Sequence, residues 1–242
     1  MSNTSKVNSS TGAAAIGGSG TESFIIKARE FVTHGFRILP IILGSFAFIM
    51  GIGQGNMAFF FLFLGVSLVV PIINMIANYG FGAIFSTFLS ENLYKIQGTG
   101  EGCSIFGSFA SSGDTISVWL AVLVFFVSYF FRNAYNLYNR PAQKGSPDYK
   151  IDARKTQALM AMVIILLFGI SMLLYRFFVS IGCETPLGIP LAFGIYIPVA
   201  YYWYELLVSC SGDRLTDLFG VANRIMVEPA NSNPGAVCLP VA

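Results

Sequence analysis

Five long apolar stretches, separated by polar or charged segments, dominate the pattern of this chain. They cover residues 38–52, 57–76, 116–131, 158–179 and 187–208. In the fourth stretch, the eighteen residues from Ala158 to Tyr175 carry no charge. A helix of that length, rising about 1.5 Å per residue, covers most of a hydrocarbon core about 30 Å thick. The pattern predicts membrane-spanning helices, with 158–179 as the central one and Arg176 reaching the headgroups.

The composition agrees with a membrane protein, because 55% of the residues are hydrophobic and only 11% are charged. Soluble domains carry roughly 25% charged residues. We therefore expect an all-α fold, a polytopic membrane helical bundle with four to five transmembrane segments and extended N- and C-terminal arms. The lipid bilayer is the first expected partner. A net charge of +2 is too small to indicate a specific nucleic-acid partner.

The remaining sequence divides the chain into regions. Residues 1–22 are rich in Ser, Gly, Asn and Ala, cannot form a core, and are predicted to be a flexible arm. In 23–36, apolar residues recur on one helical face, which predicts an amphipathic helix in the membrane interface or an extension of the first span. The transmembrane domain covers 37–208, and 209–242 form a polar tail that ends in a Pro- and Asn-rich run.

The charges that flank the spans leave the number of crossings open. Stretch 38–52 is short and contains a proline, so it can be a re-entrant or interfacial segment instead of a span. With five crossings, the basic residues Lys27, Arg29 and Arg37 lie on the opposite face from the predicted basic loop 132–157. With four crossings, both groups face the cytosol, as the positive-inside rule favours.

The predicted loop 132–157 is the most charged segment of the chain, with six basic residues against two aspartates. The basic residues are Arg132, Arg140, Lys144, Lys150, Arg154 and Lys155. Near a membrane surface, each basic residue contributes about 1 kcal/mol of attraction to anionic headgroups. We expect this loop to bind headgroups or another protein, although cytosolic loops are commonly basic for topological reasons alone.

The four cysteines match neither a disulfide scaffold nor a metal site, because the chain contains no CxxC motif and only one histidine. Cys103 and Cys183 fall in loops on the same face under either count of crossings, so they can form a disulfide if that face is lumenal. Cys210 and Cys238 fall on the other face and are expected to be free thiols. We expect no metal or other cofactor.

The spans lack the residues that an enzyme or transporter needs. No ionisable residue lies in the central part of any span, and no nucleotide-binding or hydrolase motif occurs. Asn74 and Asn78 lie four residues apart on one helix face, and we interpret them as interhelical hydrogen-bonding groups. The sequence therefore predicts a non-catalytic structural protein that anchors or organises a larger assembly.

The tail carries a resemblance to a known class of proteins. Between Ser209 and Pro240 it reads SCSGDRLTDLFGVANRIM and then NSNPGAVCLP. This resembles the tails of multi-span membrane proteins of large icosahedral double-stranded DNA viruses. The resemblance implies a membrane-embedded minor capsid protein in a virion inner membrane derived from host endoplasmic reticulum. The arm, the basic loop and the tail would then contact capsid-like proteins.

Two other functions remain as alternatives. The first is a small transporter, a channel lined by Asn and Ser, or a channel accessory subunit. The second is an accessory subunit of a membrane-bound energy-converting complex, which would pack its spans against neighbouring helices. The sequence leaves homo-oligomerisation open.

Overall fold

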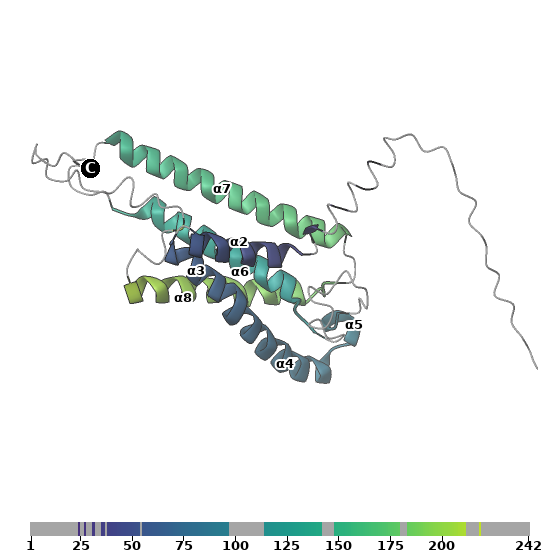
Figure 1. Cartoon of the computed structure of the whole chain (residues 1–242). Helices are drawn as coiled ribbons and strands as arrows, with labels where there is room; N and C mark the ends of the chain where they lie inside the picture. Colours follow the sequence, from purple (N-terminus) through teal and green to yellow (C-terminus); the bar gives the residue numbers. More distant parts are fainter. Residues whose placement is uncertain are drawn as a thin grey trace, which may run out of the picture. The chain divides into compact units, whose positions relative to one another are not determined.

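A computed structural model describes residues 24, 27, 31, 35–36, 38–53, 55–96, 114–141, 148–179, 183–211 and 218 (Figure 1). The chain forms two compact units, Met1–Phe36 and Arg37–Ala242. In the first unit, the five described residues are helical, and the predicted arm 1–22 lies outside the described residues. In the second unit, the described residues form helices and no strand, so the fold is all-α as predicted.

The second unit contains one short apolar helix and four helical stretches that are long and apolar enough to cross a membrane. Its elements are α2 (Leu39–Gly53), α3 (Met57–Leu64), the π-helical η1 (Gly65–Val69), α4 (Val70–Phe88), α5 (Glu91–Tyr94), α6 (Val118–Asn139), α7 (Asp148–Val179) and α8 (Gly188–Ser211). This is an integral multi-pass membrane protein. The fifteen residues of α2 extend about 23 Å, less than the hydrocarbon core, so the described helices favour four crossings.

The helices extend beyond the apolar stretches that predicted them. α6 continues to Asn139, and α7 begins at Asp148, ten residues before the apolar stretch. The predicted basic loop is therefore wrong over most of its length, because Arg132 lies in α6 and Lys150, Arg154 and Lys155 lie in α7. Hydropathy marks the length in contact with lipid, whereas a helix can continue into the polar interface. Lys144 lies outside the described residues.

The second apolar stretch forms one continuous helical run, α3–η1–α4, with a local change of register. Pro71 lies at the start of α4, and the π-helical segment lies just before it. The Val70 N–H donates to the Gly65 carbonyl five residues earlier, the bonding pattern of a π-helix. Because proline has no N–H and crowds the preceding turn, a wider turn at this point accommodates it. The run then continues to Phe88.

α6 is the central helix of the bundle, and the prediction that gave this place to 158–179 is wrong. α6 contacts α2, η1, α4, α7 and α8, and Figure 1 shows it between α7 and α8. The window of highest hydropathy in α6 is 61% buried at a mean hydropathy of 1.5, whereas that of α7 is 17% buried at 2.6. Lipid tails are as apolar as leucine, so the most apolar helix gains little from leaving them. Hydropathy therefore indicates how much of a helix contacts lipid, not whether the helix lies at the centre of the bundle.

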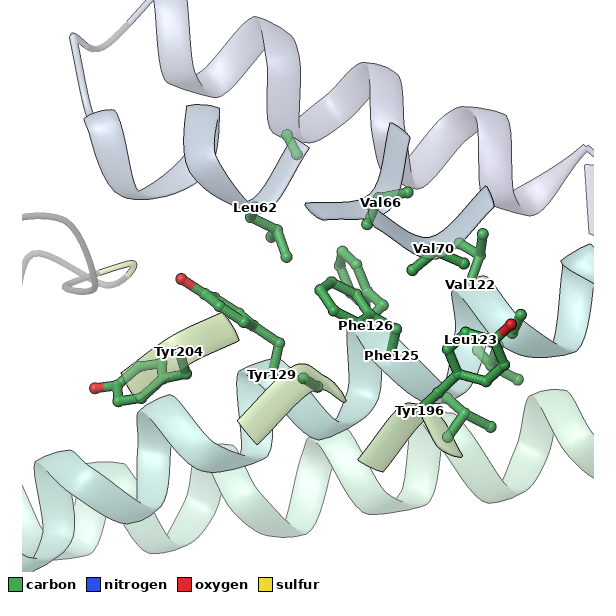
Figure 2. Close-up of a cluster of buried hydrophobic side chains, with 14 of the residues drawn as sticks. Leu62, Val66, Val70, Val122, Leu123, Phe125, Phe126, Tyr129, Tyr196 and Tyr204 are labelled. Carbon is green, nitrogen blue, oxygen red and sulfur yellow. The ribbon is translucent and has the colours of Figure 1, made fainter. Parts of the chain in front are cut away.

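Aromatic side chains of α6 fill the core between this helix and its neighbours. Figure 2 shows Phe125, Phe126 and Tyr129 facing side chains of α3, η1 and α4. The Tyr129 ring makes an edge contact with Tyr204 of α8, with centroids 5.6 Å apart. Gly65 permits the close approach of η1, because a Cβ there would lie 2.8 Å from the Phe125 ring.

Candidate functional site

A buried ion pair closes the end of the bundle where α6 begins. Arg176, in the last turn of α7, donates from Nε to Glu184 Oε1 at 2.9 Å, with side chains only 4% and 8% exposed. The Ser117 hydroxyl donates to the same oxygen at 2.5 Å, and the guanidinium lies 5.0 Å from the centre of the Trp119 ring. We call these four residues the Glu184 cluster. Arg176 was predicted to reach the headgroups, but it is buried instead.

The cluster joins the α7–α8 connection to the start of α6, which is more than sixty residues earlier in the chain. Ser117 is also the N-cap of α6 and accepts from the Leu120 N–H at 3.1 Å. Burial raises the pKa of the Glu184 carboxyl above its ordinary value, and the Arg176 charge and the Ser117 hydrogen bond oppose that shift. A buried carboxylate is tolerated here because a cation and a hydroxyl both bind it. The cluster thus fixes the α7–α8 connection against the start of α6.

A second set of bonds holds the backbone beside this cluster. The Thr185 hydroxyl donates to the Thr115 carbonyl at 2.9 Å and accepts from the Gly188 N–H at 2.7 Å, at the start of α8. Asn78 Oδ1 accepts from the N–H groups of Thr115 and Ile116, and its Nδ2 donates to the Ile116 carbonyl. Asn78 therefore satisfies backbone hydrogen-bonding groups of the turn before α6.

Asn74 makes the contact between helices. Its Oδ1 accepts from the Tyr196 hydroxyl of α8 at 2.9 Å, and both side chains are buried. Asn74 lies one helical turn, or about 6 Å, deeper in α4 than Asn78. A bond of this kind is worth about 0.6 kcal/mol on average inside a membrane.

The cysteines distinguish the two ends of the bundle. Cys183, next to Glu184 and 4% exposed, is disulfide-bonded, whereas Cys210 near the end of α8 is exposed and free. Cys103 and Cys238 lie outside the described residues, so the pairing of Cys103 with Cys183 stays a prediction.

An ion pair at the opposite end joins α6 to α8. Arg132 donates from Nε and Nη2 to Glu205 Oε1, the former at 3.1 Å, with side chains 23% and 39% exposed. The guanidinium lies 4.6 Å from the centre of the Tyr201 ring, within reach of a cation–π interaction. One turn further along α6, Asn136 donates to the Tyr204 hydroxyl at 2.8 Å. Arg132 and Ser117 are fifteen residues apart along α6, about 23 Å.

The basic residues predicted to bind headgroups have different surroundings. Arg132 forms the pair with Glu205, and Arg154 is buried and donates to the Arg140 carbonyl at 2.6 Å. This bond ties the end of α6 to the first turns of α7. Lys150 and Lys155 are exposed on α7, so these two remain accessible to a headgroup or a protein partner.

Sequence reasoning missed both ion pairs. Arg176 and Glu184 are eight residues apart across a chain reversal, and Arg132 and Glu205 meet only because α6 and α8 are neighbours. One signal was present, since each of these four charged residues lies within three residues of an end of an apolar stretch. Among the described residues, no three His, Cys, Asp or Glu side chains gather in a way that could hold a metal ion.

Comparisons of the chain with protein-family models, with curated proteins and with solved structures found no match. The viral resemblance of the tail therefore rests on its residues alone, most of which lie outside the described part of the chain.

Proposed function

We propose that this chain is a non-catalytic structural membrane protein that anchors or organises a larger assembly. The supporting observation is where the polar side chains of the described helices make their bonds. Arg176 and Arg132 each bond to another part of the same bundle, one at each of its two ends. Asn74 does the same near the end that holds the Glu184 cluster. Between the ends, the described core consists chiefly of apolar and aromatic side chains. Such an arrangement suits a fixed scaffold better than a substrate path.

The orientation follows from the cysteine and the charges. The end with the disulfide-bonded Cys183 faces the lumen or the exterior in this proposal, so the opposite end faces the cytosol. The exposed Lys150 and Lys155 lie on the cytosolic side, as the positive-inside rule requires. These lysines, together with residues 1–22 and 209–242, are the proposed contacts to partner proteins.

The finer proposal is that the assembly is a virion in which this protein links the inner membrane to the capsid shell. Its first support is the resemblance of residues 209–240 to the tails of the viral membrane proteins. Its second is the separation of a lipid-facing bundle from long polar segments at both ends of the sequence. Segments without a core of their own order when they bind, which suits contacts made during assembly. The membrane would be derived from endoplasmic reticulum, with its cytosolic side toward the shell.

The channel alternative makes a different prediction about Asn74. In proteoliposomes, we expect the purified protein to conduct no ions above the level of empty liposomes. Asn74→Leu should leave that result unchanged, because Asn74 is bonded to Tyr196 and serves packing. The measurement is a fluorescence assay of ion flux, with a known channel as the positive control. A selective flux in the wild type that Asn74→Leu or Asn78→Leu abolishes would contradict the structural proposal.

A further inference from the structure

An open groove of about 720 Å³ lies between α8 and the η1–α4 run. Its lining residues are Val69, Ile73, Val199, Tyr202, Trp203, Glu205, Leu206 and Ser209. All but Glu205 and Ser209 present apolar or aromatic surface. Trp203 is fixed as one wall because its indole N–H donates to the Phe61 carbonyl at 3.2 Å.

The length of the groove matches one leaflet of a bilayer. Its lining on α8 runs from Val199 to Ser209, eleven residues, or a rise of about 15 Å. The hydrocarbon core is about 30 Å thick, so one leaflet contributes about half of that. Cys210 and Ser211 end α8 beside Ser209, which places this end of the groove at the membrane surface and Val199 toward the midplane. A single acyl chain of one leaflet fits this geometry.

Toward its surface end, the groove is lined by a charged residue, Glu205, which is paired with Arg132 of the neighbouring α6. Glu205 is part of the lining, and its Oε1 accepts both hydrogen bonds from Arg132. Those bonds use Nε and Nη2 of the guanidinium, so Oε2 of Glu205 and Nη1 of Arg132 make no hydrogen bond to the described part of the chain and can bind a ligand. Both side chains are partly exposed, at 39% and 23%. The complementary headgroup holds a phosphate and a primary ammonium on adjacent positions.

We propose that this groove binds an aminophospholipid, with one acyl chain along α8 and the headgroup over the Arg132–Glu205 pair. The ammonium donates to Glu205 and the phosphate accepts from Arg132. A choline headgroup has the same charges but no N–H, so it cannot donate to the carboxylate. Loss of a hydrogen bond to a charged group predicts a preference of at least about tenfold for ethanolamine over choline.

The test is native mass spectrometry of the full chain after exposure to equal amounts of phosphatidylethanolamine and phosphatidylcholine. We expect at least about tenfold more bound phosphatidylethanolamine. Glu205→Gln should bring the two lipids to parity, and Leu206→Trp, which fills the groove, should remove both. Leu174→Trp is the matched control, because Leu174 is exposed on α7 away from the groove and should leave binding unchanged. Thermal unfolding of each variant checks its fold, and Val199→Trp replaces Leu206→Trp if the latter does not fold.

Three outcomes would overturn the proposal. Equal retention of the two lipids by the wild type would show that the ammonium does not donate to Glu205. Unchanged lipid binding in a folded groove-filling variant would place the lipid elsewhere. A dimer that is lost in the same variant would show that a helix of a second copy occupies the groove.

Discussion

Glu184→Ala is expected to lower the free energy of unfolding by about 3–5 kcal/mol. The variant removes the carboxylate that binds Arg176 and so breaks a buried ion pair while the guanidinium stays in the interior. The contact of the guanidinium with the Trp119 ring, at 5.0 Å, compensates for only part of this loss. The measurement is reversible unfolding in a mixed detergent system, followed by tryptophan fluorescence, since Trp119 belongs to the cluster.

The chain supplies two controls for this prediction. Glu91→Ala breaks the ion pair with Lys95, which is exposed, and should leave stability unchanged. Arg176→Leu combined with Glu184→Leu removes both charges and should recover much of the loss, because the cost comes from a buried charge that has lost its carboxylate. If Glu184→Ala unfolds at the same detergent concentration as Glu91→Ala, then the pair is not what closes this end of the bundle.

Gly188→Ala is expected to cost about 3 kcal/mol, the upper part of the range for overpacking. A Cβ at position 188 would lie 2.2 Å from the Thr115 carbonyl oxygen and 2.6 Å from the Thr185 hydroxyl. The nearer atom belongs to the backbone, so no rotamer change relieves the clash. The start of α8 must move away from α6, and the Thr185–Thr115 hydrogen bond is lost with it. The same unfolding assay measures the effect.

Gly194→Ala is the matched control on the same helix. A Cβ at that position meets nothing within 4 Å, and alanine is the better helix former by about 1 kcal/mol. The variant should therefore be as stable as the wild type or slightly more stable. Equal destabilisation by both substitutions would indicate a general sensitivity of α8, not a close approach at Gly188.

The sequence predicted the positions of the helices well because the bilayer sets a length and a polarity that the chain must meet. All five apolar stretches are helical, within two residues at most of their predicted starts except for α7. The missed start of α7 at Asp148 has the same cause, since polar residues outside the hydrocarbon can extend a helix without changing the apolar length. Hydropathy measures the membrane contact of a helix, not its ends.

The arrangement of the helices was less predictable. Choosing the most apolar stretch as the centre gave α7, whereas α6 is central, because helix packing in lipid does not follow hydrophobicity. The pairing of Arg176 with Glu184 depends on the chain reversal between α7 and α8, which folds the loop that holds Glu184 back onto the last turn of α7. Without knowledge of helix neighbours, each of these residues had the features of an ordinary interfacial charge.

The most direct test of the anchoring role is crosslinking mass spectrometry on the assembly that this protein co-purifies with after mild detergent extraction. We expect crosslinks from Lys150 and Lys155 on α7, and from Lys6 and Lys144, to coat-like structural proteins. Lys95 is the internal control, because it follows α5 at the end that holds the Glu184 cluster and should give none. A homo-oligomer without partners would contradict the account and favour a channel, and crosslinks only to other multi-pass proteins would contradict it in favour of an accessory subunit.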